Sequence, residues 1–236
     1  MQQGVLVNYL IKDYGETNAF YLPDSKILSA QIDSRRSRSG MPKDFVYKTA
    51  RDFDWTQYGE DVTFQKKIAN AFVKNFSEFR KQGRGLYIRS NTKGSGKTML
   101  ACCIANEVLK EHDIPVKFIS MIEYIELVKD KSEAGNNKKN SLMDAVLLIV
   151  DDIGATVEDK EWISNAIFRL VNRRHENLLP TIYTSNVAID KLKCDERIPS
   201  RIYEDCIQVV MPEVSVRKKN ADKATKEFLA RVLEDE

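Results

Sequence analysis

The sequence contains little histidine and no paired cysteine motif. Only two histidines occur among its 236 residues, and the four cysteines (Cys102, Cys103, Cys194 and Cys206) show no CxxC spacing. Structural zinc sites are built from closely spaced cysteine and histidine ligands, so this pattern argues against one. The adjacent pair Cys102 and Cys103 is expected to be reduced and packed in the interior.

Long apolar runs and a strong excess of one charge are also missing. No run approaches the roughly 20 apolar residues that a membrane-spanning helix needs. The first residues, MQQGVLVNYLIKDYGE, do not have the pattern of a signal peptide. We therefore expect a soluble, cytoplasmic protein. The net charge of +2 is too balanced to indicate nucleic-acid binding by itself.

The most informative stretch is GLYIRSNTKGSGKTMLACCIAN, residues 85 to 106. A short apolar run enters a polar, glycine-containing loop, and an apolar-periodic segment follows, which is the order of a phosphate loop between a strand and a helix. Glycine lets the backbone curl its N–H groups onto phosphate oxygens, and the following helix points its positive end at them. The residues expected to contact nucleotide in this stretch are Asn91, Thr92, Lys93, Gly94, Ser95, Gly96, Lys97, Thr98 and Met99.

Within that loop, Lys97 is expected to reach the β- and γ-phosphates, and the Thr98 hydroxyl to ligate Mg²⁺. The first position of the motif departs from the pattern, because Asn91 stands where glycine is usual. Asparagine tolerates a left-handed backbone better than most residues, so we expect the turn to persist. The alternative is a chance GSGKT sequence ahead of a helix.

The remaining pattern alternates strands with helices, which predicts an α/β fold with a parallel sheet flanked by helices. The continuous apolar run AVLLIV at 145–150 is typical of a strand buried on both faces. Further strands are expected at 115–120, 181–185 and 207–211, and helices at 61–82, 98–111, 121–129, 159–176 and 220–234, with short helices in 188–205. The phenylalanine stripe of 61–82 and the apolar residues Phe228, Leu229 and Val232 are expected to face inward.

The N-terminal part is expected to form a separate unit, with an appendage and basic linker at 1–50 and the domain that carries the phosphate loop at 51–236. Residues 1–25 suggest a short helix or strand pair, and 26–51 carry seven basic residues against two acidic ones. That basic stretch is either an arm for a phosphate backbone or acidic partner, or a solvated tether. The segment DFDWTQY at 52–58 is a candidate adenine contact.

A second basic stretch lies at 130–140, which reads as an exposed polar loop. Lys131, Lys138 and Lys139 make it a candidate DNA-facing loop, with ordinary solvation as the alternative.

Polar residues follow the predicted strands at the edge where parallel sheets place their chemistry. Asp151 is the expected Mg²⁺ partner, and Asp152 is placed to polarise an attacking water as general base. Asn186 can orient that water against the γ-phosphate. Arg201 can enter the site of a neighbouring subunit as an arginine finger, or form a surface ion pair with Glu204 or Asp205. Arg217 is a candidate γ-phosphate contact, with Lys218 and Lys219 as rivals.

Four segments together, LYIRSNTKGSGKTMLA, AVLLIVDDIGA, LPTIYTSN and IPSRIYED, resemble the DnaC/DnaI/IstB branch of the AAA+ ATPases over about residues 40 to 217. The resemblance implies ATP and Mg²⁺ binding, weak hydrolysis, contact with single-stranded DNA and assembly into rings or spirals. It assigns Lys97 and Thr98 to Walker A, Asp151 and Asp152 to Walker B, Asn186 to sensor 1, Arg201 to the arginine finger and Arg217 to sensor 2.

Two departures from that branch stand out. Asn91 replaces the Walker A glycine, which bears on nucleotide affinity. DnaI-like loaders carry a zinc-binding N-terminal domain, and this chain has no cysteine before Cys102. Contact with a helicase is therefore expected to use another element, within residues 1–40.

Four functions remain open on this basis. The first is an ATP-dependent helicase loader in DNA replication, which delivers a hexameric replicative helicase. The second is an IstB-like ATPase that helps a transposase choose its target. The third is a P-loop kinase, which leaves TSN and SRI unexplained. The fourth is an adaptor switched by ATP that hydrolyses it poorly, since an aspartate at 152 reaches less far than a glutamate.

Overall fold

A five-stranded parallel sheet forms the centre of the molecule in the computed structural model, which describes residues 4–9, 18–23, 25–154 and 161–233. The strand order is β4-β5-β6-β3-β7, and every neighbouring pair runs parallel. The strands are β3 (Gly85–Arg89), β4 (Val116–Ser120), β5 (Leu147–Asp151), β6 (Thr181–Ser185) and β7 (Cys206–Val210). All carboxyl ends therefore meet at one edge, as the sequence predicted.

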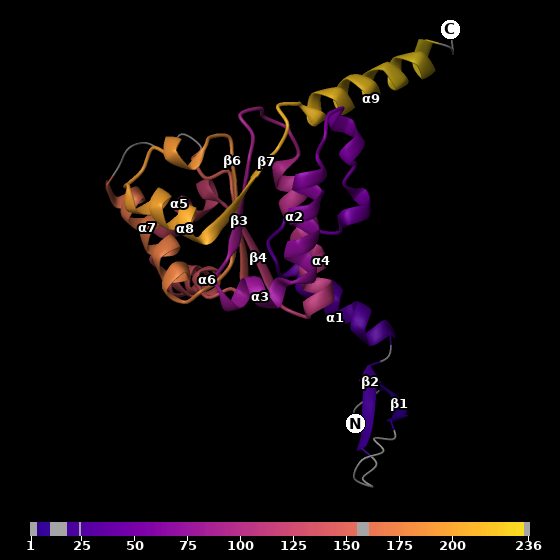
Figure 1. Cartoon of the computed structure of the whole chain (residues 1–236), viewed down its shortest axis with the longest axis vertical. Coiled ribbons are helices and arrows are strands. Elements are labelled where there is room, and N and C mark those ends of the chain that lie inside the picture. The colour runs from indigo at the N-terminus through magenta and orange to yellow at the C-terminus, as the bar shows by residue number, and fades with distance from the viewer. Residues whose placement is uncertain (1–3, 10–17, 24, 155–160, 234–236) are drawn as a thin grey trace.

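Two helical layers cover the two faces of this sheet (Figure 1). Alternate residues of β5 show why: Leu147 and Ile149 pack into one core with α2 and α4, whereas Leu148 and Val150 pack into the other with α5 to α8. The apolar run is thus buried on both sides, as a central parallel strand requires. The helices are α2 (Thr63–Lys74), α3 (Phe76–Lys81), α4 (Lys97–His112), α5 (Met121–Lys129), α6 (Glu133–Met143), α7 (Glu161–Glu176) and α8 (Arg197–Asp205).

The starts of β5 and β6 are joined by a buried arginine, Arg174 of α7. Its guanidinium donates to the Thr181 hydroxyl at 2.7 Å, to the Pro180 carbonyl at 2.8 Å and to the Ala145 carbonyl at 2.9 Å. Burial lowers the pKa of Arg174 to about 10. Buried cations need their N–H groups satisfied, and here backbone oxygens do so. The contact fixes the register of two strands whose opposite ends carry the acidic and polar residues of interest.

Three predictions about helices are corrected by the structure. The expected helix 61–82 is two helices, α2 and α3, which meet at Asn75. Its stripe is buried at Phe72 and Phe76, but Phe64 at the first turn is 59% exposed. Residues 133–143, expected to be mostly loop, form α6, because the Ser132 hydroxyl caps its first turn by accepting from the Gly135 N–H and Leu142 is buried beneath its end.

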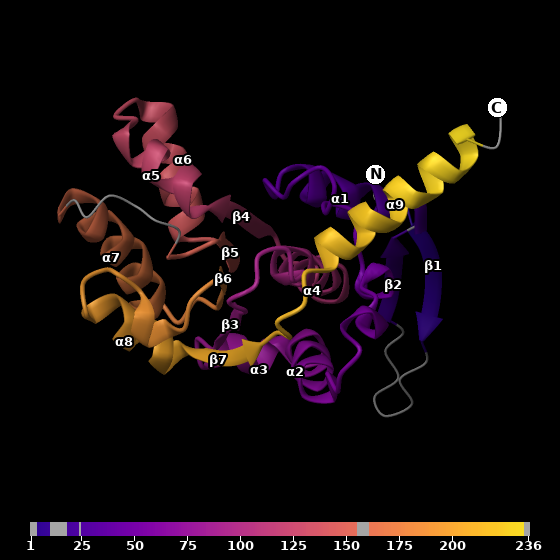
Figure 2. The same cartoon turned by 90° about the horizontal axis from the view of Figure 1, so that it is seen from above.

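The terminal helix α9 (Val216–Leu233) leaves the body of the molecule, as Figures 1 and 2 show. Phe228, Leu229 and Val232 are exposed, so the prediction that they face inward is wrong. The helix projects past the layers that would have covered them. The expected start of helix 159–176 lies partly outside the described residues.

The N-terminal appendage is a hairpin followed by a helix, not a plain tether. Strands β1 (Gly4–Tyr9) and β2 (Asn18–Pro23) pair antiparallel, and α1 (Ser25–Ser37) follows. Beyond α1 the chain packs on the sheet: the Ser39 carbonyl accepts from the Phe118 N–H at 2.8 Å, and Met41 is buried. A division at residue 50 stays a prediction, and these contacts favour a junction nearer Ser39. Among the described residues, no helix is both long and apolar enough to span a bilayer.

Candidate functional site

The loop between β3 and α4 curls in the way its glycines allow. Gly94 and Gly96 have φ angles of +75° and +88°, which is left-handed backbone. A Cβ at Gly94 would lie 2.9 Å from the Cβ of Arg217, and one at Gly96 would lie 2.8 Å from the Tyr58 hydroxyl. Both positions are therefore restricted to glycine by conformation and by space.

The aromatic segment 52–58 packs against this loop. The Tyr58 hydroxyl donates to the Ser95 carbonyl at 2.8 Å, and Phe53 packs beside Gly96. Neither aromatic residue is among the described residues that line the adjoining cavity. The expectation that 52–58 binds adenine is not supported, because the rings of Phe53 and Tyr58 pack against the phosphate loop and do not line the cavity.

Lys97 is folded back into its own loop. Its ammonium donates to the Thr92 carbonyl and the Ser95 hydroxyl, both at 3.1 Å, and to the Ser90 carbonyl at 3.3 Å. Burial lowers the pKa of Lys97, and the negative charge of Asp152 opposes that shift. A buried ammonium held by neutral oxygens would gain free energy from an anionic partner. The position of Lys97 thus suits it to bind a phosphate that enters the loop.

The ends of β5 and β6 are tied together by Thr184. Its hydroxyl donates to the Asp151 carboxylate at 2.6 Å and accepts from the Asp152 N–H at 2.9 Å. Asn186 donates to the Asp152 carboxylate at 2.7 Å, and Asp152 itself has a left-handed backbone with φ +59°. Side-chain hydrogen bonds thus fix the directions of both carboxylates.

Burial raises the pKa of Asp151, although hydrogen bonds from the Thr184 and Thr98 hydroxyls lower it. Thr98 and Asp151 also line the same cavity. Two oxygen ligands of this kind at a partly buried position are what a hard divalent cation prefers. The donor set fits Mg²⁺.

These residues surround a cavity of about 490 Å³. The phosphate loop supplies one wall, the ends of β5 and β6 the second, and the start of α9 the third. Its lining comprises Phe45, Lys93, Gly94, Ser95, Gly96, Lys97, Thr98, Met99, Asp151, Asp152, Thr184, Asn186, Val216, Arg217 and Asn220. Among the described residues that line it, Asn91 and Thr92 are absent, so these two predicted contacts stand outside the cavity.

Of the three basic candidates after β7, Arg217 is the one that lines the cavity. Its backbone N–H donates to the Gly94 carbonyl at 3.1 Å, so the start of α9 rests on the phosphate loop. Lys219 instead donates to the Gln57 carbonyl at 3.0 Å. The structure therefore favours Arg217 over Lys219.

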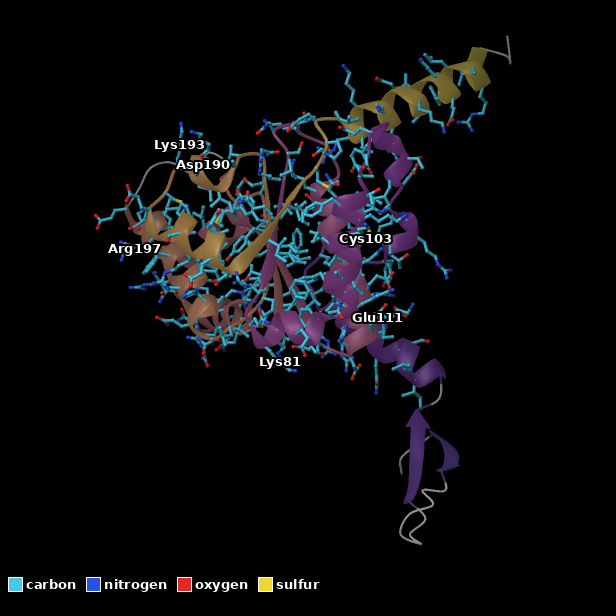
Figure 3. All side chains as sticks on the ribbon, in the orientation of Figure 1. Lys81, Cys103, Glu111, Asp190, Lys193 and Arg197 are labelled. Carbon is cyan, nitrogen blue, oxygen red and sulfur yellow. The ribbon has the colours of Figure 1, made fainter. Side chains whose placement is uncertain are left out.

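Arg201 lies away from this cavity, on α8. It borders a second hollow, of about 470 Å³, with His175, Arg197 and Glu204. Figure 3 shows the position of α8 through the label of Arg197, on the opposite side of the sheet from Cys103 of α4. The alternative partner Asp205 faces His175 at 3.0 Å.

Asn91 does not use the left-handed conformation that the sequence suggested for it. Among the described residues, φ is positive at three that are not glycine, namely Asp113, Asp152 and Leu178. The turn is held instead by Glu213, whose carboxylate accepts from the Asn91 N–H at 2.9 Å. The sequence analysis missed Glu213 and Thr184. A polar residue inside the apolar run TIYTS was a usable signal for Thr184, whereas Glu213 lies 122 positions from Asn91 and has no local signal.

The family model for IstB-like ATP binding proteins matches residues 32–224. In Bacillus subtilis, the phage-like element PBSX protein XkdC is 30% identical over 118 residues, 48% of this chain and 44% of that protein. The replicative helicase loader DnaI of the same organism is 32% identical over 129 residues, 52% of this chain and 39% of that protein. The chain thus matches less than half the length of either relative.

A crystal structure of DnaI shares the fold, with a TM-score of 0.63 and 24% identity over 72% of this chain and 94% of that one. The parallel sheet with its flanking helices is therefore the AAA+ fold that the sequence predicted. Because the family model covers most of the chain, the protein belongs to the IstB-like ATP-binding proteins, within the DnaC/DnaI/IstB branch of the AAA+ ATPases.

Proposed function

We propose that this chain is a helicase loader-like ATPase of DNA replication that hydrolyses ATP weakly. One observation carries the proposal: Lys97, Asp151, Asp152, Asn186 and Arg217 converge on a single cavity, whereas Arg201 does not. A site that is complete except for one arginine fits a protein whose copies act on each other's nucleotide.

In this proposal the phosphate loop binds the triphosphate, and Lys97 exchanges its loop oxygens for phosphate oxygens. Thr98 and Asp151 would hold Mg²⁺, which when bound neutralises charge on the phosphates. Asp152 accepts a proton from the attacking water, and the amide of Asn186 keeps that carboxylate in place. Thr184 fixes Asp151 and Asp152 relative to each other, so a single hydroxyl sets the spacing of metal ligand and base.

The base of the nucleotide would lie between the N-terminal segment and α9. Phe45, Met99, Val216 and Asn220 line the cavity beyond the phosphate loop. Three of these side chains are apolar, and the fourth is an amide able to hydrogen-bond an adenine edge. This location replaces the segment 52–58 as the candidate adenine site.

An IstB-like role in transposition remains the alternative, because the family model that matches is that of the IstB-like ATP binding proteins. An adaptor that is switched by ATP but hydrolyses it poorly is a further alternative, since the aspartate side chain at position 152 reaches less far than a glutamate would. The identity of the binding partner distinguishes the loader role from these alternatives. The element proposed to contact a helicase is the β1–β2 hairpin with α1, within residues 1–40.

Co-purification tests the partner. With ATP present, the full chain should retain a hexameric replicative helicase on an affinity column, and deletion of residues 1–24 should abolish retention while ATP binding stays within about twofold. Retention of a transposase, with no helicase bound under any nucleotide condition, would replace the loader role with the transposition role.

The shared site predicts how hydrolysis depends on concentration. The rate per molecule should rise with protein concentration, and Arg201→Ala should lower the plateau by about 100-fold or more while ATP affinity is kept. Arg197→Ala is the matched control, since Arg197 lies on the same helix but pairs with Asp195 at 2.7 Å. It should stay within about threefold of the parent rate.

Mixing two inactive variants makes this test sharper. Lys97→Ala copies lack a working site but still offer Arg201, and Arg201→Ala copies have the reverse defect. A mixture should regain activity if the arginine acts between copies. Activity that is absent from every mixture, or an Arg201→Ala defect in dilute monomer, would contradict the shared site.

Single-stranded DNA is proposed to bind a third hollow, of about 560 Å³, between α5, α6 and α7. Lys131, Lys139 and Arg169 give it positive charge, and Trp162 stands at its wall with 40% of its surface exposed. Basic groups that follow a backbone beside an aromatic ring suit stacked, unpaired bases. Lys131 and Lys139, two of the three lysines predicted to face DNA, line this hollow, whereas Lys138 is not among its described lining residues. Lys139 is on a helix and not in a loop, and contact with DNA stays a prediction.

Removing the ring tests that surface. Trp162→Ala should weaken binding of an oligo-dT probe about tenfold, in line with the loss of one stacked base. Lys139→Ala should lower the dependence of affinity on salt concentration. Phe64→Ala removes a ring of α2 that is more exposed, at 59%, and should have no effect. Equal losses in Trp162→Ala and Phe64→Ala would remove this hollow from consideration.

A further inference from the structure

Glu213 stands in the connection between β7 and α9 and grips the beginning of the phosphate loop. One carboxylate oxygen accepts from the Asn91 N–H at 2.9 Å, and the other accepts from the Ser90 hydroxyl at 3.2 Å. The Ser90 hydroxyl in turn accepts from the Thr92 N–H at 3.2 Å. The carboxylate thus organises three consecutive residues at the position where the usual glycine is missing.

Two of these three residues, Ser90 and Thr92, are also hydrogen-bonded by Lys97. The Lys97 ammonium donates to the carbonyls of Ser90 and Thr92. The Glu213 carboxylate accepts from the Asn91 N–H and the Ser90 hydroxyl. Only the Lys97 side faces the cavity, because among the described lining residues Lys97 is present and Glu213 is not. A triphosphate that takes over Lys97 would leave the Glu213 contacts in place.

A second contact joins the same connection to the other half of the loop. The Arg217 N–H donates to the Gly94 carbonyl, and the Cβ of Arg217 fills the space that a side chain at Gly94 would need. The segment 213–217 therefore spans the loop from Asn91 to Gly94 and is fixed at both ends.

We propose that Glu213 is a positioning residue, which holds the first half of the phosphate loop and sets the reach of Arg217 to bound nucleotide. This inference rests on the proposed nucleotide site. It gives a physical reason for the tolerance of Asn91: the turn is secured by a carboxylate from the connection between β7 and α9, so a glycine is not needed there.

Because Glu213 is negatively charged, a positioning role and simple electrostatic repulsion of ATP predict opposite effects of its removal. Glu213 is exposed, and its slight burial raises its pKa, but hydrogen bonds from Asn91, Thr92 and Ser90 outweigh that effect and lower the pKa. The group is thus an anion near a site for a highly charged anion, and a simple through-space view predicts that its removal strengthens ATP binding. A positioning role predicts that removal of its hydrogen bonds weakens binding.

Three substitutions separate these effects by ATP titration. Glu213→Ala should raise the Kd for ATP about tenfold. Glu213→Asp keeps the charge but withdraws the oxygens by one methylene, and should also weaken binding. Glu213→Gln keeps an acceptor for the Asn91 N–H and a donor for Ser90, and should bind ATP at least as tightly as the parent. Asp222→Ala, which removes an acid of α9 away from the loop, should change nothing.

A measurement without nucleotide keeps the test independent of the proposed function. In ligand-free protein, the Asn91 amide should exchange its hydrogen roughly tenfold faster in Glu213→Ala than in the parent or in Glu213→Gln. If the parent binds no ATP, the proposed function fails, and this exchange rate still decides the role of Glu213. Unchanged exchange, or tighter ATP binding in all three variants, would overturn the inference.

A double-mutant cycle tests the link to Arg217. If Glu213 acts through Arg217, the losses in ATP affinity from Glu213→Ala and Arg217→Ala should be clearly less than additive. Fully additive losses, with the expected exchange rates, would restrict Glu213 to the loop and remove its effect on Arg217.

Discussion

The left-handed backbone at Gly94 and Gly96 is the constraint on which the rest of the site depends. It turns the loop so that the Tyr58 hydroxyl and the Cβ of Arg217 approach to distances that no side chain at these positions would permit. Three remote segments, the aromatic turn at 52–58, the loop itself and the start of α9, are joined through those two contacts. The cavity exists because they meet there.

Electrostatics at the cavity are arranged for ligands that bring their own charge. Burial lowers the pKa of Lys97 and raises that of Asp151, so each charged form is disfavoured where it stands. A phosphate beside Lys97 and a divalent cation beside Asp151 would reverse both penalties together. Affinity for nucleotide and affinity for metal are thereby expected to reinforce each other, since neither charge is fully compensated by the protein.

Much of the fold was predictable because the signals are local. The run 145–150 could only be a strand buried on both faces, and polar residues placed after parallel strands must meet at one edge. This brought Asp151, Asp152 and Asn186 to the cavity as predicted. The roles assigned to them stay proposals.

Prediction from the sequence failed where contacts between distant segments determine the structure. Residues 133–143 look like a loop by composition, but the Ser132 cap and the buried Leu142 make them a helix. The apolar residues of α9 suggested a packed helix, yet the chain directs that helix away from the body. The bond between Glu213 and Asn91 joins positions far apart in the sequence, and no periodicity or motif marks it.

The central claim is that the loop at 91–98 binds a triphosphate through Lys97, and calorimetric titration with Mg²⁺ and ATP tests it most directly. The parent chain should bind one ATP per molecule, and Lys97→Ala should weaken binding by about 100-fold or more, because it removes the charged donor to the phosphates. Equal affinity of the parent and Lys97→Ala, or no binding by a folded parent chain, would contradict the account.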